Sequence, residues 1–344
     1  MPDREPPAWL WLRDRLSRLR PPTTPGRAGA ESVPVRVAIV TDSAAALPVH
    51  WAKPYITDGR LAVVPMPVMV GAEIYGEGED DISETLAMAL ASGSSVKTSR
   101  PSPGQFEQAY RAAETRGFEA VVSIHISSDL SGTAEAASLA ARRVSIPVEV
   151  LDSRTAGMAQ GMGVQSALLA AAAGRTAAEV RSLAHERLAR TKVYFYVPSL
   201  EQLRRGGRIG AAASLLGAVL SIKPILAVDG GKIVPLEKVR SAARAVARLE
   251  EIVAADIANR PPGQARLAVH HFGNLDEAEQ LALRLAKQCK GCPPAQISVL
   301  PAVLAAHAGL GVLAVVVGES DALDSLETAA TDPPHEQLSP DLST

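Results

Sequence analysis

The first half of the chain alternates short apolar runs with longer segments that carry apolar residues at helical spacing. The apolar runs Val35–Thr41, Val121–Ile126 and Val148–Leu151 are typical of strands that are buried on both faces of a parallel sheet. Helices are predicted after them, over Ser131–Val144 and from about Thr155 to Ala173. This β–α alternation predicts a doubly wound α/β domain with helices on both faces of its sheet.

Three other segments of this half add detail. The apolar stretch Leu61–Val70 is interrupted by two prolines, which predict an edge or bent strand because proline cannot donate to a sheet ladder. A helix is expected over Asp81–Ser92. Another helix is expected to begin at Ser102, where serine caps, Pro103 takes the first turn and Gln105 completes a capping box.

The pattern changes after Gly174. An amphipathic helix is predicted over Ala177–Arg190 and a strand over Val193–Val197, and Lys223–Arg240 forms a predicted hairpin around an Asp-Gly-Gly turn. Hairpin pairing beside helices predicts a second α/β domain with a mixed or antiparallel sheet. Its remaining elements are helices over Ser241–Asn259 and Asp276–Gln288 and strands over Leu267–His271, Ile297–Leu300 and Val312–Val317.

We therefore expect two α/β domains, over residues 35–174 and 175–318, with a segment of different composition at each end. Residues 1–34 are rich in Pro and Arg, which indicates an extension that is partly helical or disordered. Residues 319–344 are acidic and contain proline, and this composition predicts a disordered tail.

Composition narrows the possible functions. Hydrophobic residues make up 47% of the chain but aromatic residues only 3%, so we expect aliphatic groups to line any cavity. The net charge of −2 gives no electrostatic basis for binding nucleic acid. The chain has no apolar run long enough to span a membrane and no secretory signal pattern, which favours a cytoplasmic protein.

Cys289 and Cys292 form a CxxC sequence. A zinc site would need a second cysteine or histidine pair, and a redox CxxC normally lies where a strand leads into a helix. This pair instead follows a predicted helix and precedes two prolines. We expect two exposed loop thiols in a reducing cytoplasm, and no metal site.

Three polar clusters follow apolar segments: Thr41–Ser43, Lys97–Ser102 and Ser127–Thr133. Ligands of open α/β sheets bind beyond the carboxyl ends of the strands. The third cluster is also expected to open a helix, whose first amides favour an anion. Hydroxyls and amides without a paired base predict an anion-binding site rather than a nucleophile.

These clusters also have structural interpretations. Ser102 is expected to act only as a helix cap, whereas Gly132 beside Ser131 permits close approach of a ligand. Asp42 could be a lone general base, but without an evident partner we expect it to brace a turn at the strand end.

Two further clusters carry cationic groups. In the sequence LRRGGRI at 203–209, two glycines between arginines allow a sharp turn that directs Arg208 inward, where its guanidinium can bind a carboxylate or phosphate. A solvated loop is the alternative, but Ile209 and the apolar segment after it favour packing against the core. His307 is expected in a glycine-rich turn, and a lone histidine is more often structural than functional.

The chain resembles the DegV family in an ordered set of motifs: TDSAAALP (41–48), KTSRPSPGQF (97–106), SSDLSGT (127–133), LDS (151–153), LEQLRRGGRI (200–209), IKPIL (222–226) and HAGLG (307–311). The resemblance covers roughly residues 35–318. It implies a two-domain DegV-like fold, with a Rossmann-like parallel sheet first, a mixed sheet second and a lipid cavity between them. It also implies a non-enzymatic subunit that binds one long-chain fatty acid, whose carboxylate is phosphorylated by a separate ATP-binding fatty acid kinase subunit.

The resemblance further implies ligand-binding residues around the fatty acid carboxylate. Hydroxyls and an amide would bind its oxygens, and two positively charged groups would stand near the opening. The hydroxyls are those of Thr98 or Ser99 and of Ser131, and the amide is that of Gly132. The positively charged groups are Arg208 and His307. The chain departs from the family pattern at Leu310, where proline is usual, at Arg100, where glutamine is usual, and in both terminal segments.

Burial of about 15 methylenes at ~0.8 kcal/mol each is favourable by roughly 12 kcal/mol, and half of that would give a complex with a Kd of roughly tens of micromolar. The main alternative is a general lipid carrier without a kinase partner. A serine hydrolase with Ser131 as nucleophile and His307 or His125 as base lacks a G-x-S-x-G motif and an acid to orient the base. A nucleotide-binding protein would need a glycine fingerprint after the first strand, and TDSAAALP contains none.

Residues 8–20 carry a separate signal. Trp9, Leu12, Leu16 and Leu19 form one helical stripe, and four arginines against one aspartate give the segment a net charge of +3. Basic residues opposite a Trp/Leu face are typical of a helix that lies on an anionic membrane surface. Docking on the chain's own core, contact with a kinase, and disorder are the alternatives.

Overall fold

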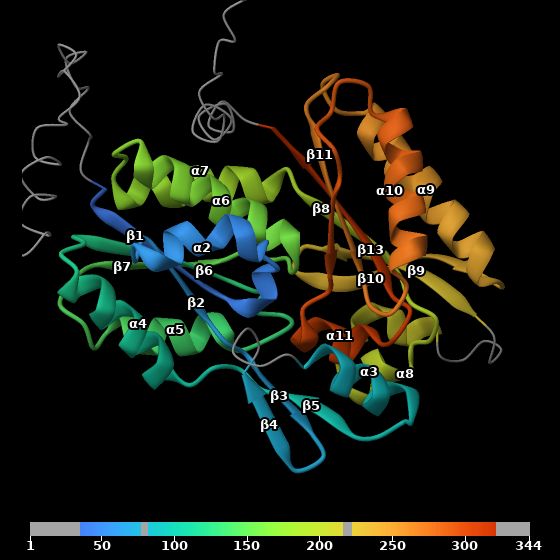
Figure 1. Cartoon of the computed structure of the whole chain (residues 1–344), viewed down its shortest axis with the longest axis horizontal. Helices are drawn as coiled ribbons and strands as arrows, with labels where there is room; N and C mark the ends of the chain where they lie inside the picture. Colours follow the sequence, from blue (N-terminus) through green and yellow to red (C-terminus); the bar gives the residue numbers. More distant parts are fainter. Residues whose placement is uncertain (1–34, 77–81, 216–221, 321–344) are drawn as a thin grey trace, which may run out of the picture. The chain divides into compact units, whose positions relative to one another are not determined.

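A four-stranded parallel sheet forms from the apolar runs of the first half of the chain (Figure 1). The computed structural model describes residues 35–76, 82–215 and 222–320. Within them this sheet has the strand order β2-β1-β6-β7, with β1 (Val37–Asp42), β2 (Leu61–Val64), β6 (Ala120–His125) and β7 (Val148–Asp152). Strands β1 and β6 are buried along their whole length, as their continuous apolar sequences predict.

Helices cover both faces of this parallel sheet (Figure 1). On one face, side chains such as Val40 and Val121 pack against α4 (Pro103–Thr115) and α5 (Thr133–Ala141). The other face of the sheet packs against α2 (Val49–Thr57), α6 (Met158–Ala172) and α7 (Ala177–Ala189). The predicted Rossmann-like arrangement is therefore confirmed.

The apolar stretch with two prolines divides between two sheets. After β2 the chain bends and enters β3 (Pro67–Val70), which pairs in antiparallel fashion with β4 (Glu73–Gly76) and β5 (Val96–Thr98) in a separate small sheet. Helix α3 (Ser83–Ala91) packs beside it. The bend was predicted from the prolines, whereas the short strands β4 and β5 were not.

The second half forms a six-stranded mixed sheet with the order β10-β9-β8-β13-β11-β12. Within this sheet, as far as the structure describes it, β11 and β12 are the one parallel pair of strands. The β9–β10 hairpin turns at Gly230 and Gly231, as predicted. The strands are β8 (Lys192–Tyr196), β9 (Lys223–Asp229), β10 (Lys232–Val239), β11 (Ala265–His271), β12 (Gln296–Val299) and β13 (Leu313–Glu319).

The two faces of the mixed sheet have different neighbours. One face packs against α9 (Ala242–Ala258) and α10 (Leu275–Gln288). The opposite face contributes Phe195 and Ala314 to an apolar cluster that also contains residues of α6 and of α11 (Ala302–Ala308). Helix α6 thus contacts both large sheets, which explains why almost all of its residues are buried.

Two expectations about local structure are wrong. Cys289 and Cys292 are not exposed loop thiols but form a disulfide at the end of α10, where the chain turn brings their Cα atoms to 5.5 Å. Cys289 is buried because the last turn of α10 directs it toward the mixed sheet. His307 lies in the last turn of α11 rather than in a glycine-rich turn, because the glycines begin only at Gly309, which ends the helix with a φ of 87°.

Some predictions lie outside the described residues. They are the extension over residues 1–34, including the basic segment 8–20, and the tail from residue 321 on. The described residues, 35–76, 82–215 and 222–320, belong to one compact unit. Their division into two domains at residue 174 stays a prediction.

Candidate functional site

A cavity lies between the mixed sheet, helix α11 and the loops that follow β5 and β6. The space that it encloses is about 840 Å³ when the solvent at its open mouth is included. Its walls are mainly aliphatic, as the composition predicts. They include Ile233, Val228, Val193 and Ala314 from the sheet and Val303 and Leu304 from α11.

Polar side chains from distant parts of the sequence meet in this cavity. Five of the six predicted ligand-binding residues line it. Strand β5 provides Thr98, whose Oγ1 lies 2.7 Å from Nε2 of His307 in α11. The residues that meet here are Thr98, Ser99, Ser131, Arg208 and His307.

Thr98 and Ser99 are not equivalent. The Thr98 hydroxyl is directed inward and bonds to His307, whereas the Ser99 side chain is exposed and donates to the Arg100 carbonyl oxygen over 3.2 Å. Of the two alternatives that the sequence left open, Thr98 has the geometry of a ligand-binding hydroxyl.

His307 has an unusual environment. Burial of its ring, and then the positive charge of Arg208, lower its pKa to about 4. Its Nδ1 has no hydrogen-bond partner among the described residues, and a Cβ at Gly206 would clash with this nitrogen. The lowered pKa favours the neutral form of His307 at pH 7, whereas the resemblance implied a positively charged group at this position.

Arg208 turns into the cavity wall, as its glycine-rich surroundings predict. Gly207 before it has a φ of 68°, a conformation that a residue with a side chain rarely adopts. The guanidinium donates from Nε to the Leu130 carbonyl oxygen (3.2 Å) and from Nη1 to the Gly206 carbonyl oxygen (2.7 Å). Its Nη2 has no partner among the described residues and can donate to an anion.

Gly132 has a different role from the one expected. It precedes the first residue of α5, as predicted, but it is absent from the residues that line the cavity. A Cβ on Gly132 would clash with the Arg100 guanidinium, which bonds to the Gly132 carbonyl oxygen at 3.4 Å and to Glu135 at 2.8 Å. Gly132 thus makes room for Arg100, and the charge of Arg100 is paired with Glu135 rather than directed at the cavity.

Ser131 stands at the start of the same helix. Its Oγ lies 2.7 Å from Oγ1 of Thr133, and its amide donates to the Ser127 carbonyl oxygen. Ser127 in turn donates from Oγ to the Gly231 carbonyl oxygen (2.8 Å), so the loop that carries Ser131 is fixed to the β9–β10 turn. Ser102 acts as a helix cap with Gln105, as predicted.

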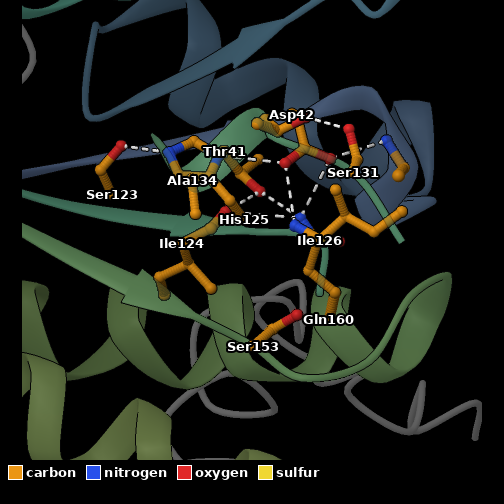
Figure 2. A network of polar contacts seen from close by, with 12 residues as sticks. Thr41, Asp42, Ser123, Ile124, His125, Ile126, Ser131, Ala134, Ser153 and Gln160 are labelled. Carbon is orange, nitrogen blue, oxygen red and sulfur yellow. Dashed lines mark hydrogen bonds and ion pairs between the residues drawn. The ribbon is translucent and has the colours of Figure 1, made fainter. Parts of the chain in front are cut away.

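A buried polar network holds the end of β6, from which the Ser131 loop departs (Figure 2). Asp42 accepts from the Ala44 amide (3.1 Å) through Oδ1 and from the Ile126 amide (3.0 Å) through Oδ2. The same Oδ2 lies 3.0 Å from Nδ1 of His125, whose Nε2 lies 2.7 Å from Oγ of Ser123. Asp42 therefore braces the turn, as predicted, and also joins the ends of β1 and β6.

This network bears on the hydrolase alternative. Asp42 does orient His125, contrary to the expectation that no acid is placed to do so, because the fold joins residues that are 83 positions apart. The hydroxyl beyond the histidine is Ser123 rather than Ser131, and Asp42, His125 and Ser123 are all 0% exposed. A substrate cannot reach this triad, so its role is structural.

Gly157 and His270 are among the cavity residues that sequence analysis did not single out. His270 belongs to a pair of histidines at the end of β11, and nothing in the sequence distinguishes the one that faces the cavity. Among the described residues, no helix has the length and apolarity needed to cross a membrane, and no cluster of His, Cys, Asp or Glu could hold a metal ion.

Comparison with known proteins places these features in a family context. A sequence profile described as uncharacterised proteins of the DegV family matches residues 36–319. The chain is 44% identical over 281 residues to the DegV domain-containing protein SCO2569 of Streptomyces coelicolor, covering 82% of this chain and 98% of that protein. It is 35% identical over 282 residues to the DegV domain-containing protein Rv2417c of Mycobacterium tuberculosis, covering 82% and 96%.

Solved structures agree with the sequence relatives. A DegV family protein from Thermus thermophilus, described by its fatty acid binding, matches with a TM-score of 0.76 at 30% identity, covering 83% of this chain and 100% of that one. DegV of Bacillus subtilis, described as a fatty acid binding protein, matches with a TM-score of 0.74 at 28% identity, covering 83% and 99%. These similarities confirm the predicted two-sheet α/β fold.

Proposed function

Because this chain belongs to the DegV family, we propose that it binds one long-chain fatty acid in the cavity. The observation that carries the proposal is an aliphatic cavity whose hydroxyl and guanidinium groups gather in one place, around Thr98, Ser131 and Arg208. Each buried methylene contributes about 0.8 kcal/mol, so the aliphatic walls supply most of the affinity. The similar proteins from Thermus thermophilus and Bacillus subtilis are fatty acid binding proteins, which supports the same ligand class here.

The polar groups fit a carboxylate. If the His307 Nε2–H donates to Oγ1 of Thr98, the Thr98 hydroxyl is left to donate its own hydrogen to a carboxylate oxygen. The Ser131 hydroxyl and Nη2 of Arg208 offer further donors. A carboxylate here would also offset the Arg208 charge felt by His307, so binding should raise the pKa of His307.

We further propose that the protein presents this carboxylate to a separate ATP-dependent kinase subunit. The γ-phosphoryl group of ATP would pass to a carboxylate oxygen, giving an acyl phosphate and ADP. Arg208, beside the carboxylate, would offset the negative charge that develops as the phosphoryl group arrives. This chain would then be a carrier rather than an enzyme, and a cytoplasmic location fits a partner that consumes ATP.

Native mass spectrometry of the purified full-length protein tests the binding proposal. We expect a mass increase that corresponds to one fatty acid per chain, identified after extraction. A protein that purifies empty and takes up neither palmitate nor oleate at micromolar concentration would contradict it. A protein that binds the acid but yields no acyl phosphate with any ATP-dependent kinase would instead be a general lipid carrier.

A further inference from the structure

The cavity runs across five of the six strands of the mixed sheet. Its lining includes Ile233 of β10, Val228 of β9, Phe195 of β8, Ala314 of β13 and His270 of β11, which are successive strands of the sheet. Neighbouring strands lie about 4.8 Å apart, so these five strands span roughly 19 Å. The cavity is therefore long in the direction across the strands.

The charged and hydroxyl groups belong to the β10 side of this span. A Cβ at Gly210, two residues after Arg208, would lie 2.8 Å from the Ile233 carbonyl oxygen of β10. Ser127, whose carbonyl oxygen accepts from the Ser131 amide, bonds to Gly231 in the β9–β10 turn. Arg208 and Ser131 thus lie next to the hairpin, and His270 on β11 lies across the sheet from them.

His270 is held firmly at its end of the cavity. Its Nε2 accepts from the Met158 amide (3.0 Å), so the ring hydrogen is on Nδ1, which donates to Oγ of Ser298 (3.0 Å). The residue is 1% exposed. Burial, and then the neighbouring His271, lower its pKa to about 4. Arg208 contributes to the lowered pKa of His307 but not to that of His270.

Gly157 completes this end of the cavity. It has a φ of 65°, and a Cβ at this position would lie 3.2 Å from Nε2 of His270 and 4.0 Å from Cδ1 of Leu304. The Gly157 backbone, the His270 ring and Leu304 therefore pack closely together. Because both ring nitrogens already have partners, His270 has no free group with which to bind a polar ligand atom or carry a proton.

We propose that His270 is the end wall of the cavity and sets the longest acyl chain that the protein accepts. This inference rests on the proposed fatty acid binding, with the carboxylate at the Arg208 side. A chain whose terminal methyl reaches the ring must stop there, because the ring cannot turn aside without breaking its bonds to Met158 and Ser298. Up to that length, each further pair of methylenes raises affinity about fifteen-fold, and beyond it the gain ends.

Delipidated full-length protein and a series of saturated acids test this proposal. Dissociation constants are measured for lauric, myristic, palmitic, stearic and arachidic acid, and the wild type should show a sharp limit in the series. His270→Ala should move the limit to an acid at least two carbons longer and raise affinity for that acid about fifteen-fold. His270→Trp should move the limit to a shorter acid.

Two further variants keep the test independent of folding. His270→Asn shortens the wall while its amide can still donate to Ser298, so it replaces His270→Ala if that variant unfolds. His271→Asn is the matched control, because this histidine follows on the same strand and does not line the cavity. Its limit should equal that of the wild type.

The outcomes separate the two proposals. A wild type that binds none of the five acids would overturn the proposed function itself. A wild type with a clear limit that stays unchanged in folded His270→Ala and His270→Asn would overturn only the role of His270. A limit that moves equally in His271→Asn would also overturn it, because the effect would then come from the strand rather than from the wall.

Discussion

His307 and His270 line the same cavity, yet they are held in different ways. Both have a pKa lowered to about 4, and burial is the largest cause for each. His270 has a partner at both nitrogens, Met158 and Ser298, whereas Nδ1 of His307 has none among the described residues and Arg208 adds to its shift. A histidine with a hydrogen-bond partner at each ring nitrogen suits a fixed wall. A histidine with an unpaired nitrogen beside a cation suits a site whose charge changes when a ligand binds.

Replacement of Arg208 tests the charged end and has the largest expected effect. Arg208→Ala should lower acyl phosphate formation with the cognate kinase by about 10²–10³-fold, because the charge of the guanidinium matters most as phosphate arrives. Fatty acid affinity should fall much less. The two quantities are measured in parallel, by acyl phosphate production and by calorimetry, with Arg204→Ala as a control because Arg204 pairs with Glu201 on the surface. Equal losses in both assays would place Arg208 in carboxylate binding instead.

Removal of one hydroxyl should have the next largest effect. Ser131→Ala should weaken fatty acid binding by roughly 1–3 kcal/mol, the cost of leaving a charged acceptor short of a donor. The melting temperature should change little, because Thr133 is the one hydrogen-bond partner of this hydroxyl within the part of the chain that the structure describes. Ser102→Ala, which removes a helix cap at a residue that does not line the cavity, should do the reverse. If Ser131→Ala is largely unfolded but its folded fraction binds fatty acid with full affinity, Ser131 has a structural role.

Acid should destabilise the empty protein through both histidines. An unfolded histidine has a pKa of about 6.5, so the unfolded state binds more protons between about pH 4 and 6.5. The free energy of unfolding therefore falls as the pH drops through this window, by about 1–2 kcal/mol per histidine between about pH 7 and 5. Above this window the two histidines do not change the free energy of unfolding with pH. Denaturant titrations at both pH values measure this loss.

Bound ligand should separate the two histidines. If palmitate binds as proposed, it should raise the pKa of His307, so the complex should lose less stability on acidification than the protein without ligand. The loss of stability that His270 causes on acidification should remain in the complex, and His270→Asn should abolish it. A loss that palmitate leaves unchanged would show that no carboxylate comes near His307.

The smallest expected effect concerns residues 8–20, which lie outside the described residues. We propose that this basic segment contacts anionic membranes, at about 1 kcal/mol for each basic residue near the surface. Deletion of residues 1–30 should reduce co-sedimentation with anionic vesicles at low salt and leave fatty acid affinity unchanged. Equal binding by both proteins, or binding by neither, would leave the extension without a membrane role.

The fold was predictable where one stretch of sequence determines one element. The apolar runs gave β1 and β6, and the capping box gave the start of α4, because these signals are local. Strands β4 and β5 were missed since each has only three or four residues, too few for a pattern. The disulfide was missed because the direction of Cys289 depends on how α10 packs.

The site was predictable only in part for a similar reason. The motifs gave five residues that line the cavity, but not the contact of Thr98 with His307, which are 209 positions apart. Gly132 was interpreted as room for a ligand, whereas the side chain that uses this room is Arg100, which is unusual at its position in the family pattern. Such pairings follow from tertiary packing, and no spacing in the sequence reveals them.

A crystal structure of the palmitate complex tests the central claim most directly. The account predicts one acyl chain in the cavity, with its carboxylate within hydrogen-bond distance of Thr98 and Ser131 and its terminal methyl directed toward His270. A chain bound in the opposite direction, with its carboxylate beside His270, or a chain bound outside this cavity would contradict it.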